Sequence, residues 1–265
     1  MKLRDKKVLL LGATGGIGSA CARQLAEQGA RLVLVARSEA KLDRLKSELG
    51  ELASAVEACF RIDFSESDFE SGLLSVAEQH ADIDYIVHAL GVNRFQNYRA
   101  NSAETLSALF EVNLFSLMHT VRILTPNLQQ RKSAGLVVIG STFGSIGYPG
   151  FTGYCASKFA LRGYVESLRR ELSDTAVDVL YIAPRATNTE LNDARIVAMN
   201  EQLGNAVDSP QRVASAVLRA MSRKRLTSYI GFPERLFVLI NGINSRLVDK
   251  GIAKQLPIIN RLLAE

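Results

Sequence analysis

Tyr154 and Lys158 are the two residues of this chain whose types and spacing best suit proton chemistry. They stand four positions apart on a predicted helix, so their side chains leave the same face. A phenol titrates at about pH 10, and a neighbouring ammonium group lowers the pKa of a phenol because it favours the phenolate. The spacing therefore indicates a tyrosine that transfers a proton in catalysis. Taken singly, the alternatives are a half-buried tyrosine and a surface lysine.

Ser141 is a third candidate catalytic residue. It follows an apolar run, 135–139, that predicts a strand. Ligands of α/β proteins bind at the carboxyl edge of the sheet, where a serine hydroxyl could hold a substrate carbonyl. The alternative is a serine that only caps the strand.

A glycine-rich segment, Leu-Gly-Ala-Thr-Gly-Gly-Ile-Gly at 11–18, joins a predicted strand at 7–11 to a predicted helix at 19–28. The free amides and the positive dipole end of such a helix attract phosphate. Gly12 permits the tight turn, whereas Gly16 and Gly18 allow the backbone to approach a pyrophosphate or the sheet. Within a complete strand-helix-strand unit, dinucleotide binding is favoured over a purely structural turn. The candidate contacts are Gly12, Thr14, Gly15, Gly16, Ile17 and Gly18.

The end of the second predicted strand, 31–36, indicates which dinucleotide is bound. An acidic residue there would accept a hydrogen bond from the ribose 2′-hydroxyl of NAD, but the chain has Arg37 and Ser38. Arg37 can pair with a 2′-phosphate and stack on adenine, which favours NADP(H) over NAD. The alternative is that Arg37 is simply a surface residue.

The apolar segments alternate between strand and helix character along most of the chain. Continuously apolar strands of this kind suit a parallel sheet covered by helices. The fold class is therefore α/β, a doubly wound Rossmann-type parallel sheet with helices on both faces, in a single domain of residues 1–265. The predicted strands are 7–11, 31–36, 55–62, 85–89, 135–139, 177–182 and 227–231, and the predicted helices are 19–28, 40–49, 69–80, 106–124, 153–172 and 211–222.

Composition narrows the class of protein. The chain has 265 residues, 47% of them hydrophobic and 22% charged, so it can bury the core of one large domain. Its net charge of +5 comes from dispersed basic residues without a nucleic-acid reader motif, so no nucleic-acid partner is expected. Cys21, Cys59 and Cys155 are odd in number and widely spaced, which suits reduced thiols in a cytoplasmic protein. They form no metal-ligand pattern with the histidines.

The motifs together resemble those of the short-chain dehydrogenase/reductase family. The glycine segment, Tyr154-x-x-x-Lys158, Ser141 and a helix-borne Asn113 follow the family's order, and the resemblance extends roughly as far as Thr189. It implies that Tyr154 transfers the proton, that Lys158 lowers the pKa of Tyr154 and binds the nicotinamide ribose, and that Ser141 orients the substrate. It further implies that Asn113 supports a water relay.

The resemblance also implies further cofactor contacts and an assembly. Asp63 and Phe64 are expected beside the adenine, and the family commonly forms a homodimer or homotetramer through its long helices. The family's Asn-Asn-Ala-Gly element is His88-Ala89-Leu90-Gly91 in this chain. The remaining expected cofactor contacts are Ala89, Gly91, Pro184, Thr187 and Thr189.

Arg185 replaces the glycine of the family's Pro-Gly turn. Two interpretations stay open, because the sequence does not show where this cation points. It could bind an anionic substrate, or it could face solvent.

Two segments near the end of the chain are expected to shape the substrate site. The polar stretch 186–208 predicts a substrate loop with a short helix. Residues 233–263 predict an amphipathic helical extension rich in leucine and isoleucine, with interspersed cations. Packing on the domain or on another subunit is favoured over peripheral contact with a membrane. The uncharged stretch 236–245 is too short to span a bilayer.

These observations predict an NADP(H)-dependent oxidoreductase that transfers hydride between nicotinamide and a carbonyl or alcohol substrate of hydrophobic character. Two alternatives remain: a non-catalytic protein that senses NADP(H) for a protein partner, and an epimerase or dehydratase that uses the cofactor transiently. The pairing of Tyr154 with Lys158 argues against the sensor, because a binding module does not require both.

Overall fold

A computed structural model of the chain describes residues 3–264, in which seven strands form one sheet with the order β3-β2-β1-β4-β5-β6-β7. Every strand pair is parallel, which confirms the doubly wound α/β fold. The order reverses between β1 and β4, and ligands bind at such a switch point. The strands are β1 (Lys7–Leu11), β2 (Arg31–Ala36), β3 (Val56–Arg61), β4 (Tyr85–His88), β5 (Ala134–Ile139), β6 (Val177–Ala183) and β7 (Thr227–Tyr229).

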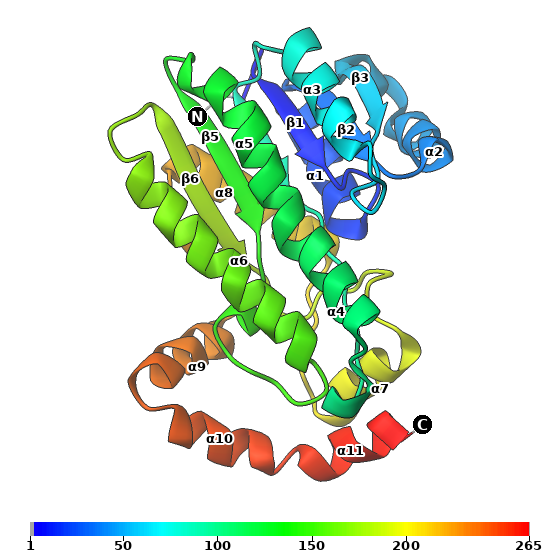
Figure 1. Ribbon diagram of the computed structural model, residues 1–265, viewed down its shortest axis with the longest axis vertical. Helices are drawn as coiled ribbons and strands as arrows, with labels where there is room; N and C mark the ends of the chain where they lie inside the picture. Colours follow the sequence, from blue (N-terminus) through cyan, green and yellow to red (C-terminus); the bar gives the residue numbers. More distant parts are fainter. Residues whose placement is uncertain (1–2, 265) are drawn as a thin grey trace.

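Helices cover both faces of the sheet (Figure 1). Successive side chains of β1 point to opposite faces, so Val8 and Leu10 lie in one apolar cluster and Leu9 and Leu11 in another. The first cluster includes residues of α1 (Gly16–Glu27), α2 (Glu39–Leu49) and α8 (Pro210–Arg223). The second includes residues of α3 (Phe69–Gln79), α5 (Ser116–Gln129) and α6 (Thr152–Glu171). These two layers hold the carboxyl ends of the strands in place.

The helix expected at 106–124 lies within a longer helical stretch, 103–129, which contains one π-helical turn. The chain forms α4 (Ala103–Phe110), a π-helical turn at Glu111–Phe115, and then α5. The Ser116 N–H donates to Glu111 O, and the Ser116 hydroxyl donates to Val112 O at 2.7 Å. In a regular α-helix the Ser116 amide would donate to Val112 O. In the wider turn the Ser116 hydroxyl makes this hydrogen bond instead. The apolar spacing continues through the turn, so the sequence contains no signal for it.

The C-terminal segment, in contrast, is not one helix. Its described residues form α9 (Phe232–Ile243), α10 (Ser245–Ala253) and α11 (Leu256–Ala264), which run beyond the carboxyl ends of the strands (Figure 1). Ile259 and Leu262 of α11 are buried with Ile196 and Met199 of α7 (Ala194–Gln202), the short helix within 186–208. Part of the extension thus packs on the domain. Across residues 3–264, no helix is both long and apolar enough to cross a membrane.

Candidate active site

The glycine segment forms a cradle suited to a pyrophosphate. Gly12 has a positive φ of 77°, and a Cβ atom at this position would lie 2.8 Å from Ala89 O. A Cβ atom at Gly18 would collide with the carbonyl group of Gly12. Helix α1 begins at Gly16, and no side chain caps its first turn, so its amides point toward the space that the glycines leave. The residues present therefore fit a dinucleotide.

Segment 186–208 returns to this cradle. A Cβ atom at Gly16 would lie only 2.7 Å from Thr189 Cγ2, so the structure brings Thr189 against the start of α1. Pro184 is buried at the end of β6, and the buried Thr187 donates its hydroxyl to Arg185 O at 3.0 Å. Thr189 is thus beside the glycine cradle, whereas the Thr187 hydroxyl is engaged by its own loop.

The expected adenine end lies at the carboxyl ends of β2 and β3. Arg37 is exposed, and Ser38 accepts a hydrogen bond from Lys41 N at 3.3 Å, which caps α2. Burial raises the pKa of Asp63, but hydrogen bonds from Ser65 and the charge of Arg37 outweigh burial, so the pKa stays below its ordinary value. Asp63 is therefore a carboxylate near Arg37. The ring of Phe64 packs on Phe69 in the core, with ring centroids 5.4 Å apart.

Tyr154, Lys158 and Ser141 come together at the carboxyl edge of the sheet. Tyr154 and Lys158 are both buried on α6, and Lys158 Nζ lies 5.8 Å from the centroid of the Tyr154 ring. Ser141, which follows β5, shares a hydrogen bond with the Tyr154 hydroxyl and accepts another from Phe143 N at 3.1 Å. The arrangement places two hydroxyl groups side by side next to an amine.

Burial affects the pKa values of Tyr154 and Lys158 more than their proximity to each other does. Burial raises the pKa of Tyr154 to about 12, although the hydrogen bond with Ser141 lowers it. Burial also lowers the pKa of Lys158 to about 8. Removing a charged form from water costs free energy, so both shifts favour neutral groups. The pKa of Tyr154 is thus raised, whereas a neighbouring lysine ammonium by itself would lower it. In this environment the tyrosine holds its proton at neutral pH.

Asn113 lies on the π-helical turn and joins α6 to the segment after β4. Its Nδ2 donates to Val92 O at 3.0 Å and to Ser157 Oγ at 2.9 Å, and its Oδ1 accepts from Val92 N at 2.8 Å. A Cβ atom at Gly91 would lie 3.4 Å from Lys158 Nζ and 3.5 Å from Asn113 Oδ1. The structure thus brings the expected asparagine and glycine to Lys158.

His88 takes part in this arrangement, although the sequence did not reveal how. Its Nε2 lies 2.9 Å from Ser116 Oγ. Because the Ser116 hydroxyl donates to Val112 O, its oxygen accepts from Nε2–H. Burial, together with the charge of Lys158, lowers the pKa of His88 to about 3, so the ring is neutral. His88 and Ser116 therefore support the π-helical turn that carries Asn113.

Arg185 fits neither of the two interpretations open from sequence. Its Nη2 lies 3.0 Å from Asp208 Oδ1 and its Nε 3.1 Å from Asp208 Oδ2, which is a bidentate pair. Its Nη1 lies 3.1 Å from Glu234 Oε1 on α9. The side chain of Arg185 is 12% exposed and that of Asp208 only 2%, so the charges are buried together. The cation joins both ends of 186–208 to α9 and is not available to a substrate.

An aromatic cluster surrounds Tyr154. The ring centroids of Phe143 and Phe151 each lie 6.4 Å from that of Tyr154, and Tyr148 stacks on Phe143 at 5.0 Å. Apolar residues of α7 and α11 belong to the same buried cluster. The density of aromatic residues just before Tyr154 was a usable signal that the sequence analysis missed. The cover by α11 depends on tertiary contacts.

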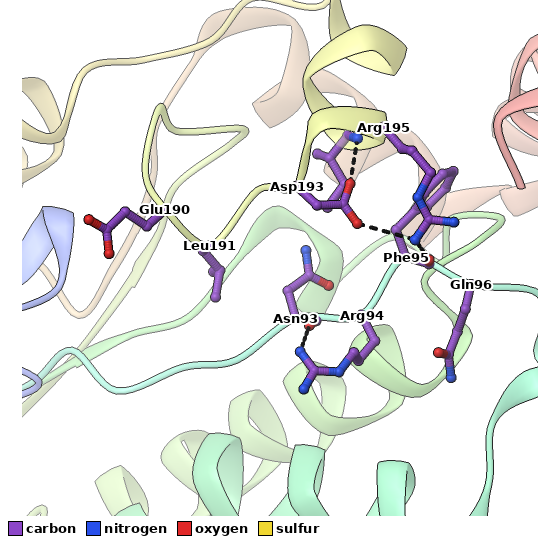
Figure 2. A pocket seen from close by; sticks show the side chains of 9 residues that line it. Asn93, Arg94, Phe95, Gln96, Glu190, Leu191, Asp193 and Arg195 are labelled. Atoms are coloured by element: carbon purple, nitrogen blue, oxygen red, sulfur yellow. Dashed lines mark hydrogen bonds and ion pairs between the residues drawn. The ribbon is translucent and has the colours of Figure 1, made fainter. Parts of the chain in front are cut away.

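A pocket of about 230 Å³ lies between the segment after β4 and 186–208 (Figure 2). Arg195 crosses between the two segments, since its Nη2 donates to Phe95 O at 3.1 Å and pairs with Asp193 Oδ2 at 3.2 Å. The expected substrate loop is thereby tied to the segment that carries Val92. The pocket is lined by Asn93, Arg94, Phe95, Gln96, Glu190, Leu191, Asp193, Arg195 and Ile196.

Comparisons with known proteins identify the family of the chain. A family model described as short chain dehydrogenase matches residues 6–199. The 3-dehydrosphinganine reductase of Danio rerio is 28% identical over 243 residues, which cover 87% of this chain and 73% of that protein.

Solved structures share the fold. A short chain dehydrogenase from Burkholderia cenocepacia in complex with NADP superposes with a TM-score of 0.80 at 20% identity, covering 95% of this chain and 99% of that one. A short chain dehydrogenase/reductase from Burkholderia phymatum in complex with NAD gives 0.81 at 23% identity, covering 93% and 96%. The family match spans most of the chain, and the structures reproduce its architecture. The chain therefore belongs to the short-chain dehydrogenase family and is an oxidoreductase of that type.

Proposed function

We propose that this protein is an NADP(H)-dependent oxidoreductase that reduces apolar carbonyl compounds or oxidises the corresponding alcohols. The observation that carries the proposal is the Tyr154 hydroxyl, which is hydrogen-bonded to Ser141, close to Lys158 and enclosed by aromatic side chains. A proton donor in such surroundings suits a substrate whose polar part is a single oxygen atom.

The residues that would hold the cofactor lie along the carboxyl edge of the sheet. Bound NADP(H) supplies or takes up the hydride. The glycine cradle and the first turn of α1 would hold the pyrophosphate. Lys158 would bind the nicotinamide ribose, and Arg37 the 2′-phosphate. Four of the other expected contacts, Asp63, Ala89, Gly91 and Thr189, lie along the same edge.

The chain's own groups perform the proton transfer. The hydroxyls of Ser141 and Tyr154 together would hold the substrate oxygen, and Tyr154 would donate its proton as that oxygen gains negative charge. The ammonium of Lys158 would stabilise the phenolate that remains, although burial lowers the pKa of this lysine. Asn113 fixes the backbone beside Lys158, and the aromatic cluster excludes water.

A screen of NADPH oxidation tests the proposal. Aldehydes, ketones, steroids and acyl thioesters should be offered, together with 3-dehydrosphinganine, which the name of the Danio rerio relative suggests. We expect stoichiometric NADPH consumption with an apolar ketone or aldehyde. Conversion of a substrate without net NADPH consumption would instead indicate an epimerase or dehydratase, and binding of NADPH without conversion of any substrate would indicate a sensor.

Exchange of Arg37 tests the choice of NADP(H). In Arg37→Gln, we expect KM for NADPH to rise by roughly 10- to 150-fold, because a charge-assisted hydrogen bond contributes about 1.5–3 kcal/mol. KM for NADH should stay unchanged. Arg44→Gln is a matched control, because Arg44 is an exposed arginine on the neighbouring α2. Equal losses with both cofactors would show that Arg37 does not recognise the 2′-phosphate.

The pH dependence of reduction should report the ionisation of Lys158. Because burial lowers the pKa of Lys158 to about 8, the positive charge is lost as the pH rises through that value. Tyr154 stays protonated there, since burial raises its pKa to about 12. We expect kcat/KM, which reports ionisations of the free enzyme, to be level near about pH 7 and to fall about tenfold per unit above Lys158's pKa. Initial rates across this range test the assignment. An additional acidic limb at about pH 6.5 would contradict it, because that value is typical of histidine and His88 titrates far lower.

We also propose a homodimer or homotetramer built on the long helices. Phe115 at the end of the π-helical turn, Met118 on α5 and Phe159 on α6 are large apolar residues that remain exposed. Such residues on adjacent helices suit a subunit interface. A cytoplasmic location is proposed because the cysteines are free thiols.

A further inference from the structure

Helix α9 presents an apolar face to solvent, here called the outer face. Phe232, Leu236, Leu239 and Ile243 stand at positions i, i+4, i+7 and i+11, so they share one side of the helix. Their exposed fractions are 79%, 46%, 60% and 80%. No residue of α9 is buried. Four large apolar side chains therefore form a stripe on the surface, which for a helix of this kind marks a contact site.

The opposite side of α9 attaches the helix to the domain. Glu234 pairs with Arg185, and Asn241 Nδ2 donates to Ser145 O at 2.9 Å. These two residues lie about two turns apart and on the same side of the helix, away from the outer face. Rotating α9 so that its apolar stripe is buried would break both the ion pair of Glu234 and the hydrogen bond of Asn241. The outer face is thus held outward.

Positive charge accompanies the outer face. Arg235 on α9, Arg246 and Lys250 on α10, and Lys254 directly after α10 are all exposed. Within 232–254 the acidic residues are Glu234, which Arg185 neutralises, and Asp249. An exposed apolar stripe on a helix with lysine and arginine around it is typical of a segment that lies in the plane of an anionic membrane surface.

We propose that the outer face of α9 docks on an anionic membrane surface. A second copy of the chain is a poorer partner on electrostatic grounds. A two-fold interface places the same patch against itself, so the cations around one outer face would meet those of the other. The exposed apolar residues of α5 and α6 offer a separate surface for subunit contact.

The position of α9 links docking to the proposed reaction. Beyond the carboxyl ends of the strands, α10 and α11 follow one another and α9 lies beside α10 (Figure 1), while apolar residues of α11 pack in the cluster around Tyr154. A docked protein would hold these three helices close to the lipid. Resting on the proposed function, this arrangement would let an apolar substrate pass from the membrane to Tyr154.

Vesicle flotation of the full-length protein tests the docking. Two vesicle types are compared, phosphatidylcholine alone and phosphatidylcholine with about one third phosphatidylglycerol; we expect flotation only with the anionic type. Raising NaCl from about 0.1 M to about 1 M shortens the Debye length from about 10 Å to about 3 Å and should release the protein. Failure of the unaltered protein to float with anionic vesicles would overturn the proposal.

Matched variants locate the docking surface. Ile243→Asp and Leu239→Asp should each weaken flotation at least about tenfold, because they place charge on the outer face, which would enter the lipid interface. Leu74→Asp on α3 is the control, since Leu74 is a large apolar residue that is 49% exposed and distant from α9 in sequence. Arg235→Gln should weaken binding about fivefold, the equivalent of about 1 kcal/mol per cation near the membrane. Equal loss in Leu74→Asp would contradict the assignment of the surface.

Two further measurements separate docking from its alternatives. Thermal unfolding shows that each variant is folded, and light scattering gives its mass in solution. If Ile243→Asp halves the mass and the unaltered protein does not float, the outer face is a subunit interface and the proposal is wrong. Flotation requires no turnover, so failure of the proposed reaction would leave this result intact, and a failure to float would leave the NADPH assay intact.

Discussion

Replacement of Tyr154 by phenylalanine is expected to lower kcat by about 10²- to 10⁴-fold, the usual contribution of a general acid, and to leave NADPH affinity nearly unchanged. The variant keeps the ring among Phe143 and Phe151 and removes only the hydroxyl that pairs with Ser141. Single-turnover rates and NADPH fluorescence titrations measure the two quantities separately.

Tyr148→Phe is the matched control for this variant. Tyr148 belongs to the same aromatic cluster, and its hydroxyl donates to Gln255 Oε1 at 2.6 Å, away from Ser141. Loss of that hydrogen bond should cost about 1 kcal/mol of stability and leave kcat close to its original value. If Tyr154→Phe retained full turnover, or if Tyr148→Phe lost as much, Tyr154 would not be the proton donor.

Replacement of Arg185 by alanine should lower the free energy of unfolding by about 3–5 kcal/mol, because it leaves carboxylates buried without their partner. Asp208 is almost fully buried, and the more exposed Arg212, with Nε 3.4 Å away, compensates only in part. The corresponding fall in Tm is roughly 6–20 °C for a domain of this size. Urea unfolding followed by circular dichroism measures the change.

Two further variants test whether the loss of stability comes from the buried charges or simply from the loss of an arginine. Arg44→Ala removes an exposed ion pair with Glu48 and should leave the unfolding midpoint unchanged. Adding Asp208→Asn to Arg185→Ala should recover part of the stability, because it removes the unpaired charge. A midpoint for Arg185→Ala equal to that of Arg44→Ala would show that the buried charges contribute no net stability.

The lower pKa of Lys158 and the higher pKa of Tyr154 have one cause. Both groups lie under apolar cover, and α7 and α11 contribute to it from distant parts of the chain. Local spacing shows that the two side chains share a helix face, but it does not show how much water reaches them. The sequence therefore does not show whether the pKa of Tyr154 is raised or lowered.

The π-helical turn illustrates a second kind of limit. Asn113 was identified by its place in a motif, and the structure does bring it to Gly91 and Lys158. The widened turn that carries it is supported by Ser116 and by His88, which follows no helical spacing relative to Ser116 because it lies on β4. A contact between a strand and a helix leaves no periodic signal in either segment.

The parallel α/β fold, the glycine cradle at the start of α1 and the family of the chain can all be predicted from the sequence. These properties depend on local hydrophobic period, on backbone freedom at particular glycines and on the order of short motifs. Three other properties emerge only from the folded chain: the partners of Arg185, the raised pKa of Tyr154 and the outward direction of the apolar stripe on α9. Each of these depends on burial and on charges that the fold brings together, as Asp208 and Glu234 meet at Arg185.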